Sequence, residues 1–569
     1  MMFTALLLLL LLLLLLALAR RSWGAQGTRT QGALPPGPTP LPLLGNLLQL
    51  ESRRLDRALM ELSGRWGPVF TVRLGPRPAV VLCGYSALRD ALVLQADAFS
   101  GRGAMAVFER FTHGNGIVFS NGLRWRTLRN FALGALKEFG LGTRTIEERI
   151  LEEAACLLGE FQATTGAPFD PRRLLGNAVS NVICSVVFGN RYGYEDPEFQ
   201  RLLDLFNDNF RIMSSRWGEM YNVFPTLLDW LPGPHHRIFQ NFTELRVFIS
   251  EQIQRHQQTR QPGKPRDFID CFLDQMDKEQ NDPESHFQEE TLVMTTHNLF
   301  FGGTETTSTT LRYGLLILLK YPEVAAKVQA ELDAVVGQSR TPRLGDREHL
   351  PYTNAVLHEI QRFISVLPLG LPRALTRDTH LHGYFLPKGT FVIPLLVSSH
   401  RDPTQFKDPD CFNPTNFLDD KGEFQTNDAF MPFAPGLGQE GGDKAGQAPG
   451  CLVPTLHPCV LRKEDVPGSR PGAIGDLPLL YRHPAAVLFA PSGEPCQHRP
   501  EPTVHWPGQH PPSLPAPSGG PLRAGLAALC SLAPRPPYPV WSIKALNCRW
   551  TGLLTSKWKQ ENQRIAALR

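Results

Sequence analysis

The stretch GGTETT, residues 302–307, places small residues, hydroxyls and one acid inside a long apolar segment that covers 291–320. Each glycine inside a helix costs about 1 kcal/mol relative to alanine, and a buried acid needs a partner. Small side chains would let a flat ligand lie against this helix, and Glu305 and Thr306 would form a proton relay beside it. The open alternative is a locally flexible helix on which Glu305 is solvated.

A second candidate is the pair Glu359 and Arg362, which lie three residues apart in LHEIQRF and therefore share one helix face. A solvated surface pair of this kind adds little stability, whereas a buried pair needs further polar partners. The apolar neighbours Leu357 and Phe363 favour burial, and the turn-rich segment FNPTNF at 412–417 is a possible source of a partner.

Four further residues could bind an anion. Trp125 and Arg129 are four residues apart in GLRWRTLRNF, so an indole N–H and a guanidinium can donate to the same anionic group. Packing on an amphipathic helix is the alternative. Arg102 in FSGRG and Arg373 in LPRALTRDT add cations in turns rich in glycine or proline.

The elements that must position these residues are mostly helices. Helical periodicity is present at 145–165, 196–213, 243–258, 288–320 and 323–336. Short strand-like runs occur at 69–74, 78–83 and 390–396. The sequence therefore predicts a mainly α protein with a small β-rich lobe.

Composition limits the class of protein. The 569 residues are enough for a large core, and the apolar (42%) and charged (20%) contents are ordinary for a globular protein. The net charge of +4 comes without a basic block, which argues against nucleic-acid binding. The ten cysteines form no CxxC or zinc-ligand spacing, which favours a reducing compartment and argues against a secreted, disulfide-bonded binding protein.

The N-terminus predicts a membrane anchor at residues 1–21. Residues 5–19 are only leucine and alanine, Arg20 and Arg21 follow, and no basic residue precedes them, so the bulk of the chain is expected in the cytosol. A cleaved signal peptide is the alternative, but it requires a basic segment that is missing here. The linker at 22–46 ends in LPPGPTPLPLLGN, which predicts a stiff, extended connector.

The ordered set of motifs resembles the microsomal cytochrome P-450 monooxygenases, and their drug- and xenobiotic-metabolising family 2 in particular. The set comprises the leucine anchor, LPPGPTPLPLLGN, WRTLR, GGTETT, HEIQR, FNPTNF and FMPF, and it extends over residues 1–436. The resemblance implies a cytochrome P-450 fold at 47–436, a haem cofactor, and NADPH- and O2-dependent oxidation of lipophilic small molecules. It also implies an NADPH-dependent membrane reductase as partner and location in the endoplasmic reticulum membrane.

The resemblance also assigns roles to the candidate residues. The GGTETT helix would cross the distal haem face, with Gly303 where the helix is distorted to admit dioxygen. Glu305 and Thr306 would deliver the protons that favour O–O cleavage. Glu359 and Arg362 would lock to the segment called the meander, where Asn416 replaces a frequent arginine or histidine. The haem propionates would be bound by Arg102, Trp125, Arg129 and Arg373. An apolar substrate pocket, or alternatively plain core, would be formed by Phe108, Phe111, Phe301, Val366 and Leu369.

The family's metal-ligand motif is interrupted. Its form is F-x-x-G-x-R-x-C-x-G, in which a cysteine thiolate binds the iron. Here the motif begins at Phe433, but Gly438 stands at the arginine position and Glu440 at the cysteine position. Cys451 is a poor substitute, because no arginine precedes it and prolines follow within the segment that should be helical. No residue is therefore assigned as metal ligand.

The tail at 437–569 differs from the rest of the chain in composition. From Gly436 onward it holds 21 of the chain's 50 prolines and one of its 33 phenylalanines. Such a segment is expected to be disordered and unrelated to the family, as a retained intron, a frameshift or a mispredicted exon would produce. The prediction is an inactive monooxygenase with an incomplete C-terminal end. The alternative is an active enzyme with a substitute ligand or from a differently spliced form.

Overall fold

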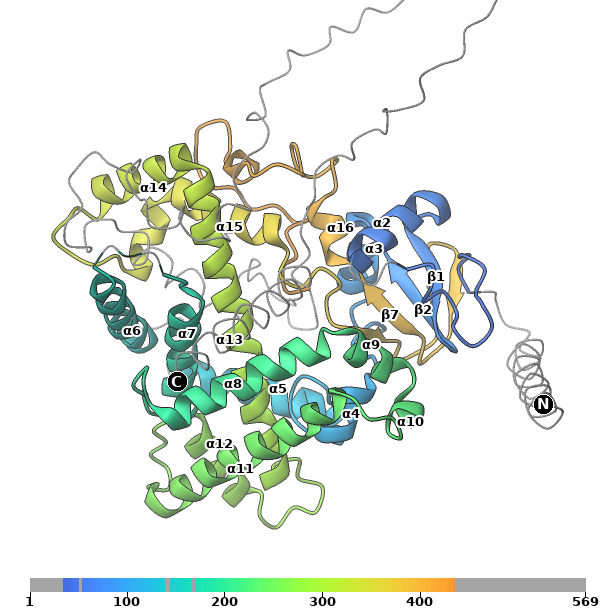
Figure 1. The fold of residues 1–569 in the computed structure, drawn as a ribbon, viewed down its shortest axis with the longest axis horizontal. Helices are drawn as coiled ribbons and strands as arrows, with labels where there is room; N and C mark the ends of the chain where they lie inside the picture. The colour runs from blue at the N-terminus through green and yellow to red at the C-terminus, as the bar shows by residue number, and fades with distance from the viewer. Residues whose placement is uncertain (1–33, 51–53, 139–143, 166, 168, 435–569) are drawn as a thin grey trace, which may run out of the picture.

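The structure, a computed structural model, describes residues 34–434 except 51–53, 139–143, 166 and 168 (Figure 1). The predicted anchor, most of the linker and the tail at 437–569 lie outside the described residues, as do Glu440 and Cys451. Among the described residues, no helix combines the length and the apolar character that crossing a membrane requires. None of the five described cysteines forms a disulfide.

The described chain is mainly helical with a small sheet, as predicted. The helices are α2 (Leu55–Trp66), α3 (Tyr85–Arg89), α4 (Ala106–Thr112), α5 (Gly122–Glu138), α6 (Arg144–Ala163), α7 (Arg172–Val187), α8 (Pro197–Met213), α9 (Arg216–Val223), α10 (Pro225–Leu228), α11 (His235–Thr259), α12 (Phe268–Lys278), α13 (Glu289–Lys320), α14 (Pro322–Val335), α15 (Pro351–Ile364) and α16 (Leu396–His400). Shorter turns are the π-helix η2 (Asp90–Leu94) and the 3-10 helices η3 (Leu344–His349) and η4 (Pro414–Phe417).

The sheet has five strands in the order β1-β2-β7-β4-β3, and a separate hairpin pairs β5 with β6. The strands are β1 (Val69–Leu74), β2 (Arg77–Leu82), β3 (Gly101–Arg102), β4 (Arg373–Ala374), β5 (Thr379–Leu381), β6 (Tyr384–Leu386) and β7 (Phe391–Pro394). The β2–β7 pairing is parallel and the others are antiparallel. The sheet lies at one side of the molecule, and α6, α7, α8 and α11 lie at the other (Figure 1).

Both faces of the sheet are buried. In β2, Val80 and Leu82 point to the core formed with α3 and η2, whereas Ala79 and Val81 point to the core formed with α2. This alternation follows from the period of two in a strand. It explains why both strands of the β1–β2 hairpin are rich in apolar residues on both faces.

The proline-rich connector covers the outer edge of the sheet. The N–H of Thr71 in β1 donates to the carbonyl of Pro36 at 2.9 Å, and the N–H of Arg73 donates to Oδ1 of Asn46 at 2.7 Å. A Cβ added at Gly37 would collide with the Thr71 backbone, so only glycine permits this approach. The connector thus satisfies an edge strand that would otherwise be open to pairing.

The largest core surrounds α13, and its neighbours α7, α8 and α11 contribute most of the remaining buried side chains. The predicted helix at 243–258 begins earlier, at His235, because its buried apolar series already includes Ile238 and Phe242. The predicted strand at 390–396 ends at Pro394, and α16 starts two residues later. The other helical predictions match α6, α8, α13 and α14 within two residues at each end.

Candidate active site

The centre of α13 has one open face and one tightly packed face. A Cβ added at Gly302 would meet nothing within 4 Å, whereas a Cβ at Gly303 would lie 2.6 Å from Cδ1 of Ile183 in α7. α13 is one continuous helix through both glycines. Gly303 therefore allows α7 and α13 to approach closely, and Gly302 leaves a strip of helix backbone accessible.

The two candidate proton carriers, Glu305 and Thr306, come shortly after these glycines in α13. The Thr306 hydroxyl donates to the carbonyl of Gly302 at 2.7 Å, a bond to the residue one turn earlier that tends to bend helices. The Thr309 hydroxyl donates to Oε1 of Glu305 at 3.2 Å. Burial raises the pKa of Glu305, and the charge of Arg312 opposes that rise. The carboxyl can therefore hold its proton at a higher pH than a solvated glutamate.

Arg102 and Arg373 form a half-buried pair of like charges. They are direct partners in the β3–β4 ladder. Nε of Arg102 donates to the carbonyl of Val118 at 2.8 Å, but its Nη1 is buried without a hydrogen-bond partner. Burial, and next the charge of Arg373, lower the pKa of Arg102 to about 9. Two adjacent, half-buried guanidinium groups are a setting in which an anionic group would bind strongly.

Trp125 and Arg129 lie on α5 as predicted for one helix face. The Arg129 guanidinium carbon lies 5.7 Å from the Trp125 ring centroid. Both side chains are half-buried, and burial lowers the pKa of Arg129. The start of α5 also adjoins Arg102, because Oδ1 of Asn121 accepts from the Arg102 N–H at 2.6 Å.

Glu359 and Arg362 form a buried ion pair on α15. Both side chains are fully buried, and Nε and Nη2 of Arg362 each donate to a carboxylate oxygen at 2.7 Å. Nη1 of Arg362 donates to the carbonyls of His400 and Pro409 at 2.7 and 2.8 Å. The Asn416 amide approaches both carboxylate oxygens only at 3.5 Å, the long limit of a hydrogen bond.

The segment that leads into the interrupted motif is held in place by α16. The Ser399 hydroxyl donates to the carbonyl of Ala429 at 2.8 Å, and Nε2 of His400 accepts from the N–H of Met431 at 3.0 Å. Nδ1 of His400 is 2.7 Å from the Ser365 hydroxyl. These anchors fix the chain up to the last described residues, 432–434.

Three of the predicted pocket residues come together. The Phe108 ring lies 5.6 Å from Phe111 and 6.0 Å from Phe301, between centroids. Val366 is half-buried in the segment after α15, and Leu369 packs against the core beside β7. Leu369 therefore lies with the sheet, and the aromatic cluster joins α4 to α13.

Some site residues were missed at the sequence level. Oδ1 of Asn298 accepts from the N–H groups of both Ile117 and Val118 at 3.0 Å. These bonds hold the loop between α4 and α5 against α13. His297 lies among the pocket phenylalanines. The sequence could have indicated His297, because it precedes Phe301 by four residues and the two therefore share one helix face.

The comparisons with known proteins agree with this geometry. The family model "Cytochrome P450" matches residues 35–438. The chain is 56% identical to cytochrome P450 2F2 of Mus musculus over 71% of this chain and 83% of that protein. It is 54% identical to cytochrome P450 2F1 of Homo sapiens over 72% and 83%, and 49% identical to cytochrome P450 2B4 of Oryctolagus cuniculus over 72% and 83%.

The chain belongs to the cytochrome P450 family. Cytochromes P450 bind haem, and the residues present fit that group on one side. The unpartnered Nη1 of Arg102 beside the half-buried Arg373 suits a haem carboxylate, and the open strip at Gly302 suits a flat ring system. Glu440, which stands where the family has its cysteine ligand, lies outside the described residues.

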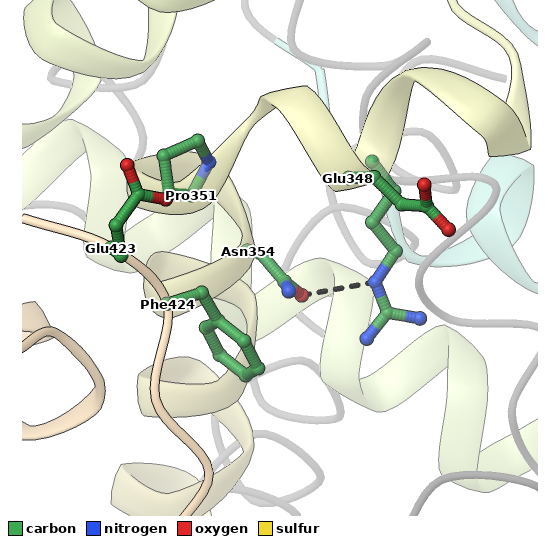
Figure 2. Close-up of a pocket in the computed structure, with 6 residues that line it drawn as sticks. Glu348, Pro351, Asn354, Glu423 and Phe424 are labelled. Atoms are coloured by element: carbon green, nitrogen blue, oxygen red, sulfur yellow. Dashed lines mark hydrogen bonds between the residues drawn. The ribbon is translucent and has the colours of Figure 1, made fainter.

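Two other features of the described chain, a pocket and an ion-pair cluster, lie apart from the candidate haem-binding residues. A pocket of about 430 Å³ lies at the start of α15, lined by Arg347, Glu348, Pro351, Asn354, Glu423 and Phe424 (Figure 2). None of the candidate site residues lines it. His256, Asp267 and Asp270 meet at metal-ligand spacing, but His256 pairs with Asp267 at 2.8 Å and Asp270 pairs with Arg266 at 2.6 Å. That cluster is an ion-pair network that joins α11 to α12.

Proposed function

We propose that this chain is a non-catalytic member of the NADPH- and O2-dependent haem monooxygenases that oxidise lipophilic small molecules. The observation that carries the proposal is Glu440 at the cysteine position of the ligand motif, with Gly438 at the arginine position. A bound haem supplies oxygen activation in this family only with a strong electron donor such as a thiolate behind the iron. The family match also ends at residue 438.

The remaining residues would keep their binding roles. Arg102 and Arg373, with Trp125 and Arg129, would hold the haem carboxylates. Glu305 and Thr306 would hold protons on the distal side, with the Glu305 carboxyl favoured in its neutral form by burial. The phenylalanines at 108, 111 and 301 would bind an apolar substrate and exclude water.

The test is the Soret band of the reduced protein under carbon monoxide. The full-length chain is expressed in membranes beside cytochrome P450 2F2 of Mus musculus, and both are reduced and exposed to the gas. We expect the strongly red-shifted, thiolate-type band from the mouse protein and no such band from this chain. A red-shifted band from this chain would contradict the proposal, and its loss in Cys451→Ser would then identify the substitute ligand.

We further propose that the chain is bound to the endoplasmic reticulum membrane and faces a membrane reductase. Exposed apolar side chains support this location: Leu48, Leu227 and Trp230 are 73%, 59% and 85% exposed. Gly75, in the turn between β1 and β2, lies against Val223 of α9. The sheet therefore packs against α9 at this turn. The full-length chain is expected to stay in the membrane fraction in alkaline carbonate, and release into the supernatant would contradict the anchor.

A further inference from the structure

A buried histidine lies at the centre of the aromatic cluster. His297 of α13 is 2% exposed. Its ring centroid lies 5.2 Å from Phe206 of α8 and 5.1 Å from Phe242 of α11. It lies 5.6 Å from Phe111 of α4 and 5.8 Å from Phe301 of α13. One imidazole is therefore enclosed by phenyl rings from four helices.

Both nitrogens of this ring are buried without a hydrogen-bond partner. The three other buried histidines of the described chain differ. His235 has Nε2 2.8 Å from the carbonyl of Leu228, and both ring nitrogens of His256 and of His400 have partners within 3.0 Å. A buried polar group without a partner destabilises the fold, so an apolar residue would serve packing better at position 297.

The histidine belongs to the wall of the proposed substrate pocket. Phe111 and Phe301 are only partly buried, and the ring of each lies close to both His297 and Phe108. Phe301 also stacks on Phe210 at 4.3 Å. A ligand bound beside Phe108 is therefore separated from the imidazole by one phenyl ring, that of Phe111 or of Phe301.

We propose that His297 is a specificity-determining residue that hydrogen-bonds a neutral hydroxyl or carbonyl group on an otherwise apolar ligand. The inference rests on the proposed function, because it requires the aromatic pocket to bind lipophilic molecules. The ring is neutral at pH 7, since burial lowers the pKa of His297 to about 3. One nitrogen then donates and the other accepts, so a hydroxyl can pair with either and a carbonyl with the donor. A charged substrate would lose its hydration among phenyl rings and is disfavoured.

The experiment compares two ligands that differ by one hydroxyl, 4-propylphenol and propylbenzene. Their Kd values for the full-length chain are measured by equilibrium dialysis, which requires neither turnover nor a haem spectrum. In His297→Phe, we expect the preference for the phenol over the hydrocarbon to fall about tenfold, the effect of one lost buried hydrogen bond. The Kd of propylbenzene should change by less than about twofold, because the phenyl ring refills the space.

Two further variants separate this role from packing. Thr296→Val removes a neighbouring buried hydroxyl that also has no partner, on a different face of α13, and should leave the preference unchanged. His297→Gln keeps a donor and an acceptor and should retain most of the preference, which also covers the case in which His297→Phe fails to fold. An unchanged preference in folded His297→Phe would overturn the inference and leave the pocket intact. If neither ligand binds the parent chain, the pocket and this inference both fail.

Discussion

At the scale of single residues, the Glu359–Arg362 pair makes the sharpest prediction about stability. Arg362→Leu leaves a carboxylate in full burial and removes the donors to the carbonyls of His400 and Pro409. Such a loss typically destabilises a protein by about 3–5 kcal/mol. We expect a large fall in the midpoint of thermal unfolding, measured by circular dichroism on the full-length chain.

The control for this variant is an exposed ion pair. Arg201 and Glu244 are 59% and 50% exposed, so Arg201→Leu should cost less than about 1 kcal/mol. The double variant Glu359→Leu/Arg362→Leu should recover part of the loss, because no charge remains buried. Equal effects of Arg362→Leu and Arg201→Leu would show that burial of the pair does not matter to stability.

Glu305 gives a prediction about pH. Burial raises the pKa of its carboxyl in the folded chain above the value of the unfolded chain. Between these two values the folded state binds more protons, so stability falls as pH rises through this window. Glu305→Gln should therefore raise the thermal midpoint by a few degrees at pH 7 and flatten its dependence on pH above about 4.5. A lower midpoint for Glu305→Gln at pH 7 would mean that the charged form is favoured in the fold.

At the scale of elements, two adjacent glycines of α13 should respond in opposite directions. Gly302→Ala adds a methyl group into open space and should stabilise the helix by about 0.5–1 kcal/mol. Gly303→Ala places a Cβ 2.6 Å from Cδ1 of Ile183 and should destabilise the α7–α13 contact by about 1–2 kcal/mol. Thermal midpoints of both variants and of Gly303→Ala/Ile183→Val measure the difference. If the smaller side chain at 183 restores no stability, the clash is not the cause.

The sequence was informative about elements with a strong local pattern. Helical periodicity located α6, α8, α13 and α14 closely, because each buries one regular apolar face. The strands β3 and β4 are two residues long and carry no local signal, since they form only by pairing with each other and, for β4, with β7. The motifs suggested that Arg102 and Arg373 bind an anion, but only the strand pairing shows that the two residues are neighbours.

The candidate site was predictable only in part. The spacing of Glu359 and Arg362 indicated one helix face but could not decide between burial and solvation, because the partners at 400 and 409 come from a distant segment. The pocket at Phe108, Phe111 and Phe301 was implied by the family resemblance, and plain core was its alternative. The enclosure of His297 by α8 and α11 depends on how four helices pack, which no local pattern specifies.

At the scale of the whole molecule, the anchors at Ala429 and Met431 hold the chain in position up to the point where the family motif is interrupted. Under the proposed function, the fold of 34–434 should need only the family's ligand segment to complete a haem site. We predict that a chimaera of residues 1–436 with the corresponding C-terminal segment of cytochrome P450 2F2 of Mus musculus gains the thiolate-type Soret band. In that chimaera, Arg102→Leu should reduce haem content, because the buried guanidinium would no longer meet a haem carboxylate.

A smaller change provides the matched control for that chimaera. Gly438→Arg/Glu440→Cys restores both motif positions but keeps the following sequence with its prolines at 454 and 458, which are residues that a helix interior does not tolerate. The residues around a metal ligand orient it, so a cysteine without the family's following segment should not give the red-shifted band. Haem incorporation by neither protein would locate a further defect in residues 1–436, which the two proteins share. A red-shifted band from the double variant would show that the two motif positions alone account for the lost ligand.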